Sequence, residues 1–351
     1  MLRCKIVCDS NSPHLSQIYT GFSLLHEAGD IVLSQECRNK DFFDATKPQH
    51  LRDAKHAHLL VILNDEIKLY YDCHDSHEID ETAAGEVDCY FKRSYAQSRI
   101  PGSISSTVFP LGLNYEVYPE SVDSFEQQRL ASRSQLSVPE VPRFRPTVEK
   151  MHATPDSLPA RGVLFITRAW DPFDHPDRSD EKIAERISIN ESRARCIKVL
   201  KREFGDSILA GFSHTEYAAR HYPDALLQDN KLSEKENYIK LLTLYPICVT
   251  TTGLHGSIGW KMGEYVAFSR AIVSEKLNYD VPGDFKQGHN YLSFDEPDQC
   301  ASMVNDLLSD VALKNAMTKA NHEYYLSYLK PDAMIWRTLK IGLTQDPLHA
   351  R

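Results

Sequence analysis

Short apolar runs alternate with longer amphipathic segments through most of this chain, and this alternation constrains the fold more than any other feature. The first example runs from a strand-like segment at 2–8, through a helical segment that ends at Gly29, to a second strand-like segment at 31–33. Strands that alternate with helices of about 10–20 residues build parallel sheets with right-handed crossovers. The sequence therefore predicts an α/β protein.

The alternation occurs in two blocks, and 351 residues are enough for two domains. A proline-punctuated stretch rich in Ser, Glu and Arg separates the blocks. We predict an N-terminal domain over 1–120, a linker over 121–160, a C-terminal domain over 161–330 and a closing helix and tail over 331–351. In the first block, segments 58–63 and 67–71 are spaced like a hairpin. In the second block we expect strands at 162–167, 207–212, 247–252 and 271–274, and helices at 181–204, 234–244, 259–268, 299–310, 311–329 and 333–343.

Charge and cysteine content narrow the class of protein. The net charge of −9 disfavours nucleic acid as the main partner, because nucleic-acid binders usually carry a basic surplus. The eight cysteines form no CxxC pair, and several lie in apolar runs, which is typical of buried thiols in a reducing compartment. The chain shows no signal-peptide pattern and no apolar run of about 18 residues. We therefore expect a cytoplasmic protein with at most peripheral contact to the inner face of a membrane.

The segment 247–275 has the pattern of an anion site. An apolar strand leads through a glycine-rich loop into a helix, and the free amides and dipole of a helix N-terminus attract phosphate. Gly256 lets the backbone approach a phosphate, Ser257 can donate a hydroxyl, and Lys261 lies one turn into the helix. Glu264 follows on an adjacent face. A nucleotide site and a plain βα turn with a surface Lys–Glu pair both fit this spacing, which lacks the standard nucleotide-binding motifs.

The run 259–275, continued through 288–292, 307–310 and 321–325, resembles the donor-binding segment of GT-B glycosyltransferases of the group 1 type. The resemblance covers 162–340, whereas the first 120 residues match only in architecture. It implies two Rossmann-like domains that face a cleft, the last helix crossing back to the first domain. It also implies that Glu264 holds the donor ribose.

Retaining members of this superfamily often carry a second glutamate eight residues before the ribose-binding one. This chain has Gly256 at that position, with His255 beside it. Inverting and retaining chemistry therefore both stay open, and His255 is one catalytic candidate.

Two arginines precede this segment. Arg168 ends the first strand of the second domain, at the edge where open α/β sheets bind ligands, and could form a fork on the donor diphosphate. An ion pair with Asp171 or Asp174 is the alternative. Arg193 lies in a charged helix, where a solvated face is the favoured expectation and a reach into the cleft is the alternative. A chain of net charge −9 that binds a diphosphate must gather positive potential locally, and we expect it at Arg168, Lys261 and the helix N-terminus.

Deprotonation of an acceptor generally falls to the N-terminal domain in GT-B enzymes. Asp9 and His14, which follow the first strand, are the first candidates, and the polar cluster 72–78 is the second. The cluster also contains Cys, His, Asp and Glu, but its spacing matches no standard zinc pattern. We expect no metal cofactor, because helix dipoles and basic side chains usually stabilise the leaving diphosphate in this superfamily.

Taken together with these residues, the resemblance to GT-B enzymes implies a glycosyltransferase. It would move a sugar from a nucleotide-sugar donor, its co-substrate, to a hydroxyl of a saccharide or glycolipid acceptor. By resemblance alone, the expected setting is bacterial surface-polysaccharide or glycoconjugate synthesis. A nucleotide-sugar epimerase on the same scaffold and a non-catalytic nucleotide-sugar-binding subunit are the alternatives.

Overall fold

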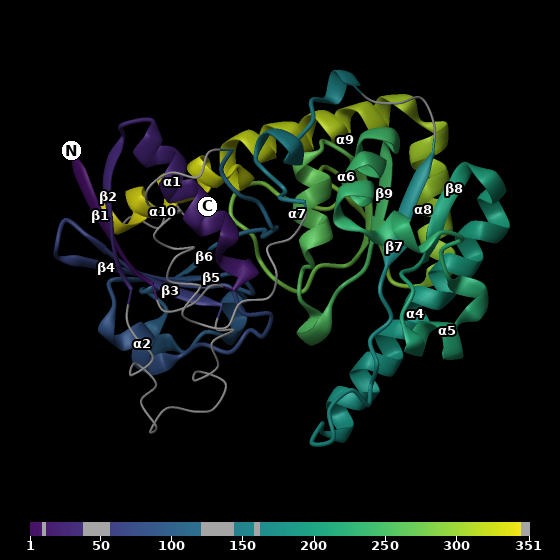
Figure 1. Cartoon of the computed structure of the whole chain (residues 1–351), viewed down its shortest axis with the longest axis horizontal. Coiled ribbons are helices and arrows are strands. Elements are labelled where there is room, and N and C mark those ends of the chain that lie inside the picture. The colour runs from purple at the N-terminus through teal and green to yellow at the C-terminus, as the bar shows by residue number, and fades with distance from the viewer. Residues whose placement is uncertain (9–11, 38–56, 121–143, 158–161, 345–351) are drawn as a thin grey trace. The chain divides into compact units, whose positions relative to one another are not determined.

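The computed structural model describes residues 1–8, 12–37, 57–120, 144–157 and 162–344 (Figure 1). The chain forms two compact units. The first comprises Met1–Lys150, Tyr279–Asp284 and Leu326–Arg351, and the second comprises Met151–Asn278 and Phe285–Tyr325. Most of the predicted linker at 121–160 lies outside the described residues.

A six-stranded sheet forms the centre of the first unit. Its strands are β1 (Leu2–Cys8), β2 (Ile31–Cys37), β3 (His58–Leu63), β4 (Ile67–Asp72), β5 (Cys89–Lys92) and β6 (Val108–Pro110). They lie in the order β2-β1-β3-β4-β5-β6, and β3 runs antiparallel to both neighbours while the other pairs are parallel. The predicted hairpin of β3 and β4 is confirmed. Without β3, the order is that of a doubly wound sheet that reverses between β1 and β4.

Two helices from opposite ends of the chain cover one face of this sheet: α1 (Ser16–Glu27) and α10 (Pro331–Thr344). They approach so closely that a Cβ on Gly21 would lie 2.3 Å from the carbonyl oxygen of Pro331. Their apolar side chains share the main core with β1, β3 and β4. The predicted return of the last helix to the first domain is therefore confirmed. Helix α2 (Glu81–Glu86) packs in a separate small cluster with β5. Short 3-10 helices lie at Pro13–Leu15, Gln97–Arg99 and Gly102–Ile104.

The second unit contains a fully parallel sheet. Its strands are β7 (Val163–Thr167), β8 (Ile208–Phe212), β9 (Ile247–Thr250), β10 (Ala271–Glu275) and β11 (Leu292–Phe294), in the order β11-β10-β9-β7-β8. The predicted strands at 162–167, 207–212, 247–252 and 271–274 are confirmed to within a few residues. The sequence patterns did not identify β11, which has only three residues.

Helices cover both faces of the second sheet (Figure 1). They are α4 (Asp180–Phe204), α5 (Glu216–His221), α6 (Lys235–Leu244), α7 (Trp260–Ala267), α8 (Pro297–Ser309) and α9 (Val311–Tyr324). Helices α4 and α8 pack together, and α7 packs with α9. A five-residue π-helix, Tyr325–Leu329, follows α9 and leads to α10. The α/β class with two Rossmann-like units is therefore confirmed. No helix in the described part of the chain has the length and apolarity needed to cross a membrane.

Candidate functional site

The strand order of the second unit brings together two loops that are distant in sequence. Because β7 lies between β8 and β9, the chain leaves β7 toward one side of the sheet and β9 toward the other. Open α/β sheets bind ligands at the carboxyl ends of their strands, at this point of reversal. Arg168 directly follows β7, and Thr251 directly follows β9. The candidate site is built around these two loop starts.

Arg193 of α4 ties the two loops together. Its Nε donates to Thr251 Oγ1 at 2.8 Å, its Nη1 to the Arg168 carbonyl at 2.7 Å and its Nη2 to the Thr252 carbonyl at 3.0 Å. Burial lowers the pKa of Arg193 to about 10, Glu275 opposes this shift and Arg168 adds to it. The expectation of a solvated Arg193 is therefore wrong. This side chain lies inside the edge at which a ligand would bind.

Arg168 itself is exposed and stacks on an aromatic ring. Its guanidinium carbon lies 3.9 Å from the ring centroid of Trp170. Asp174, which the sequence suggested as a partner, instead pairs with Arg178 and Arg186. Within the described part of the chain, Arg168 makes no ion pair, so its charge is available to an anion.

The loop after β9 has the tight geometry that its glycines predict. Gly256 has a φ of +64°, and a Cβ there would lie 2.7 Å from Asn278 Nδ2, so a larger residue would be strained in conformation and would displace the Asn278 side chain. Gly253 donates its N–H to the Ser257 carbonyl at 2.8 Å, and Ser257 donates to the Leu254 carbonyl at 3.1 Å. Ser257 is buried beneath this closed loop.

His255 lies on the same loop and is exposed. Its φ of +61° is unusual for a residue with a side chain. The backbone N–H donates to Glu185 Oε1 at 2.5 Å, which connects the loop to α4. The structure thus places this catalytic candidate at the surface of the glycine-rich loop.

Lys261 and Glu264 both project from α7, but each has its own partner. The Nζ atom of Lys261 lies 3.8 Å from the ring centroid of Tyr238, and burial lowers the pKa of Lys261 to about 8. Glu264 is buried, and its Oε1 accepts a hydrogen bond from Lys235 Nζ at 2.6 Å. Burial raises the pKa of Glu264, but the charges of Lys235 and Lys261 outweigh this and leave the pKa below its usual value. Glu264 is therefore ionised at neutral pH.

The charges of these side chains act on one another. The charge of Arg193 contributes to the lowered pKa of Lys261, and the charge of Arg168 contributes to that of Arg193. Three of the predicted donor-binding residues, Arg168, Lys261 and Glu264, therefore share one electrostatic neighbourhood. Positive charge exceeds negative charge in this group, which contains the cations Arg168, Arg193, Lys235 and Lys261 and the carboxylates of Glu264 and Glu275.

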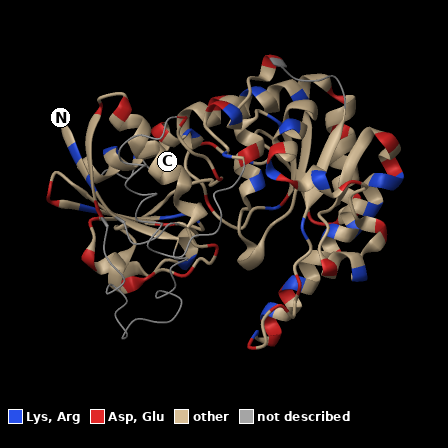
Figure 2. Ribbon diagram, viewed as in Figure 1, with Lys and Arg blue, Asp and Glu red and all other residues tan. Residues whose placement is uncertain are grey.

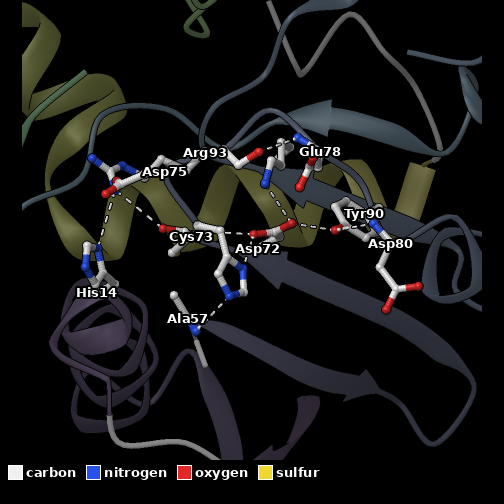
Figure 3. A network of polar contacts seen from close by, with 12 residues as sticks. His14, Ala57, Asp72, Cys73, Asp75, Glu78, Asp80, Tyr90 and Arg93 are labelled. Carbon is white, nitrogen blue, oxygen red and sulfur yellow. Dashed lines mark hydrogen bonds and ion pairs between the residues drawn. The ribbon is translucent and has the colours of Figure 1, made fainter. Parts of the chain in front are cut away.

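A second polar group lies at the carboxyl edge of the first sheet (Figure 3). Asp72 ends β4 and is buried. Its carboxylate accepts hydrogen bonds from Tyr90 Oη at 2.5 Å, Lys92 Nζ at 2.8 Å and His74 Nδ1 at 2.8 Å. Burial raises the pKa of Asp72, but Lys92 and His74 more than offset this, and the pKa lies far below its usual value. Asp72 is a permanently ionised acceptor.

This carboxylate sets the tautomer of His74. Because Asp72 accepts from Nδ1, that nitrogen carries the proton and Nε2 carries the lone pair. Nε2 accepts a long hydrogen bond, 3.4 Å, from the Ala57 backbone N–H. A partly exposed histidine held by a buried carboxylate has the arrangement of a general base. The same contact also anchors the start of β3.

His14 lies in the same group but has a different character. Arg93 Nη1 is 3.4 Å from His14 Nδ1 and 2.5 Å from Asp75 Oδ1 (Figure 3). Burial lowers the pKa of His14 to about 4, with a further contribution from Arg93, so the imidazole is neutral at neutral pH. The sequence treated His14 and the cluster 72–78 as alternatives, whereas the structure brings them together. Asp9, the other candidate, lies outside the described residues.

No group of three or more His, Cys, Asp or Glu side chains in the described part of the chain is placed to hold a metal ion.

Sequence reasoning favoured a solvated face for Arg193 and did not identify Lys235 at all. Arg193 had a usable signal, because it continues the inward stripe of α4 that contains Ile197 and Leu200 at intervals of three and four residues. Lys235 had none. It is the first residue of α6, 29 positions from Glu264, and only the packing of α6 against α7 brings the two together.

No protein-family model and no curated protein matches this chain. Solved structures of GT-B glycosyltransferases do match at low identity. The C-terminal domain of a group 1 family glycosyl transferase from Francisella tularensis is 12% identical, with a TM-score of 0.35, over 52% of this chain and 97% of that domain. TarM from S. aureus, solved with UDP, is 16% identical, with a TM-score of 0.39, over 74% of this chain and 44% of TarM.

An alpha-glucosyltransferase solved with UDP-glucose and DNA containing an abasic site matches over almost the whole length. It is 11% identical, with a TM-score of 0.46, over 97% of this chain and all of that chain. Matches to several longer proteins span only 44–64% of their length. At these identities, the likeness concerns the fold alone.

Proposed function

We propose that this protein is a glycosyltransferase that transfers a sugar from a nucleotide-sugar donor to a hydroxyl of a saccharide or glycolipid acceptor. The observation that carries the proposal is the excess of positive charge at the point of reversal in the second sheet. Arg168 and Lys261 rest on aromatic rings and make no ion pair within the described residues, while the ionised Glu264 lies one turn further along α7. Unpaired cations beside a carboxylate suit a ligand that combines a diphosphate with free hydroxyls.

Each donor contact follows from this arrangement. The diphosphate would lie against Arg168, Lys261 and the backbone at Gly256 and Ser257, where the glycine loop leads into α7. The ribose hydroxyls would donate to Glu264. Because Lys235 already bonds Oε1 of this carboxylate, the ribose must use Oε2 or displace Lys235.

The transfer reaction then requires stabilisation of the leaving group and, in an inverting reaction, a base for the acceptor hydroxyl. The bond between the sugar C1 and the phosphate oxygen breaks, and the leaving nucleoside diphosphate gains negative charge that Arg168 and Lys261 stabilise. In an inverting reaction the acceptor oxygen attacks C1 and a base takes its proton. We assign the base to His74, because Asp72 holds its Nδ1–H and leaves the lone pair on Nε2. His14 suits this role less well, because its Nδ1 faces Arg93 and its pKa is about 4.

The setting that fits this activity is the cytoplasmic face of the membrane, in the assembly of a bacterial surface polysaccharide or glycoconjugate. The first unit would then hold the acceptor.

A thermal-shift screen of the full chain against nucleotide sugars with uridine, guanosine, adenosine and cytidine bases tests the donor step. A specific donor raises the melting temperature because it binds only the folded state. If no nucleotide sugar and no nucleoside diphosphate shifts the transition, the proposed function is wrong.

A product assay then separates three activities on the same scaffold. Release of nucleoside diphosphate only when a saccharide or glycolipid acceptor is present supports transfer. An epimerised nucleotide sugar formed without acceptor identifies an epimerase instead. Donor binding without turnover on any acceptor identifies a non-catalytic subunit. Double-stranded DNA belongs in the acceptor panel, and transfer to it would overturn the saccharide assignment.

A further inference from the structure

The inward face of α4 carries three buried polar side chains between its first turns and its middle. Arg186, Asn190 and Arg193 are spaced four and three residues apart, so they lie on one side of the helix. They are 7%, 0% and 6% exposed. The remainder of α4 shows a mixture of acidic and basic residues (Figure 2), and its inward stripe continues as Ile197 and Leu200. We call Arg186, Asn190 and Arg193 the polar stripe.

Each member of the polar stripe bonds to the backbone of the loop after β7. Arg193 Nη1 donates to the Arg168 carbonyl at 2.7 Å. Asn190 makes two bonds to one residue, because its Nδ2 donates to the Trp170 carbonyl at 2.7 Å and its Oδ1 accepts the Trp170 N–H at 2.8 Å. Arg186 Nη1 donates to the Asp171 carbonyl at 3.0 Å. The stripe therefore holds this loop at three successive points.

Burying these polar side chains costs free energy that a purely structural contact between apolar side chains would not cost. Arg193 is a buried cation whose hydrogen-bond partners are two carbonyls and a hydroxyl, and its lowered pKa reflects the cost of desolvation. Well-packed apolar side chains are often at least as stable as buried charged ones. The same helix uses Ile197 and Leu200 further along its inward stripe. The polar stripe thus specifies one conformation of the loop at a cost in stability.

The loop that it holds presents Arg168 and Trp170. The Arg168 guanidinium stacks on the Trp170 ring at 3.9 Å, and the Arg186 guanidinium lies 5.4 Å from the same ring centroid. Burial and, secondly, the charge of Arg186 lower the pKa of Arg168, and Arg168 has no carboxylate partner within the described residues. Holding it in place before a ligand arrives removes an ordering cost from binding an anion.

We propose that Arg186, Asn190 and Arg193 are positioning residues that pre-organise the Arg168–Trp170 pair for the diphosphate of the donor. The inference rests on the proposed function, since it assigns these residues to the same donor site. None of the three needs to touch the donor. They act through the backbone of residues 168–171.

The first test uses Asn190→Leu in the full chain, which removes both bonds to Trp170 with little change in volume. Asn321→Leu is the matched control, because Asn321 is equally buried and donates to the carbonyls of Arg270 and Asn290 in another part of the unit. We expect Asn190→Leu to weaken binding of UDP, GDP or ADP, whichever the wild type binds most tightly, by about tenfold or more. Asn321→Leu should lower thermal stability but leave nucleotide affinity unchanged.

The second test measures the stacking of Arg168 on Trp170 by tryptophan fluorescence, without any ligand. The chain has three tryptophans, and in a background that carries W260F and W336F only Trp170 remains. Release of Arg168 from the ring by Asn190→Leu should increase acrylamide quenching of Trp170 by about twofold and shift its emission. Arg193→Met should act in the same direction, and Arg193→Lys should restore part of the wild-type signal.

The outcomes separate the two proposals. Unchanged Trp170 quenching in folded Asn190→Leu would overturn the positioning role even if the wild type binds no nucleotide. Wild-type nucleotide affinity in that variant would overturn its role in donor binding while leaving the glycosyltransferase proposal in place. A wild type that binds no nucleoside diphosphate would overturn the proposed function, and with it the diphosphate as the ligand.

Discussion

At the carboxyl edge of the first sheet, Lys92 pairs with Asp72 and Arg93 pairs with Asp75. At the corresponding edge of the second sheet, Arg168 and Lys261 lie on the rings of Trp170 and Tyr238. Both edges therefore carry cations, but Lys92 and Arg93 have carboxylate partners, whereas Arg168 and Lys261 make no ion pair among the described residues. An edge with matched charges suits a neutral ligand and a proton transfer, whereas an edge with unmatched cations suits an anion. The difference predicts which unit controls donor affinity and which controls turnover.

The largest expected effect concerns stability in the first unit. Asp72→Ala leaves the buried Lys92 without its partner, and breaking a buried pair in this way costs roughly 3–5 kcal/mol of the free energy of unfolding. Urea-induced unfolding measures this cost. Asp65→Ala, which removes an exposed pair with Arg3, should change stability by less than about 1 kcal/mol. Affinity for the donor in folded protein should not change, and a selective loss of that affinity would contradict the comparison.

The next effect concerns turnover. His74→Gln removes the proposed base, so kcat should fall roughly 100-fold or more while donor affinity stays constant. Steady-state kinetics with calorimetry of donor binding separates the two quantities. His77→Gln is the control, because His77 lies three residues away in the same segment. Equal kcat values for His74→Gln and wild type would reduce His74 to an anchor for Ala57.

A moderate effect is expected at Glu264, the proposed ribose-binding residue of the second unit. Glu264→Ala should weaken donor binding by roughly 1.5–3 kcal/mol, the value of a hydrogen bond to a charged group. Isothermal titration calorimetry measures it. Glu236→Ala removes an exposed carboxylate that pairs with Lys240 on α6, and it should leave affinity unchanged. Wild-type affinity in folded Glu264→Ala would exclude Glu264 from the site.

The smallest effect is a pH dependence of donor affinity. Because the pKa of Lys261 is lowered to about 8, its ammonium loses the proton as the pH rises through that value. In the proposed site the charged form of Lys261 binds the donor diphosphate, so affinity should fall about tenfold between about pH 7 and pH 9. Calorimetry across this range provides the measurement. Lys261→Arg should flatten the profile, and a flat wild-type profile would show that Lys261 does not contact the diphosphate.

Much of the fold could be predicted because its signals are local. The stripe on α1, the hairpin of β3 and β4, and the strand, loop and helix around Gly256 are each encoded within about 30 consecutive residues. Periodicity of 2 or 3.6 residues reports directly on such segments. The short helices α2 and α5 were not identified, because six residues make fewer than two helical turns. The three-residue strand β11 was not identified either.

The candidate site was predictable only in part, for a related reason. Arg168, Lys261 and Glu264 lie where a strand ends or a helix begins, and that position can be read from local pattern. The partners of these residues cannot be predicted from local pattern. Arg193 bonds Arg168 across 25 positions and Thr251 across 58, and Lys235 bonds Glu264 across 29. A charged residue in a charged helix looks solvated until packing buries it.

The sequence by itself determined the order and type of most elements, the glycine-rich turn, and the presence of cations at the end of β7 and the start of α7. Tertiary structure decided which of those cations are neutralised. Pairing depends on strand order, since the reversal between β7 and β9 places Arg193 against two loops, and the reversal between β1 and β4 places His14 beside Arg93 and Asp75. The sequence gives the charge of each residue, but whether a cation has a carboxylate partner depends on which side chains the fold brings close together.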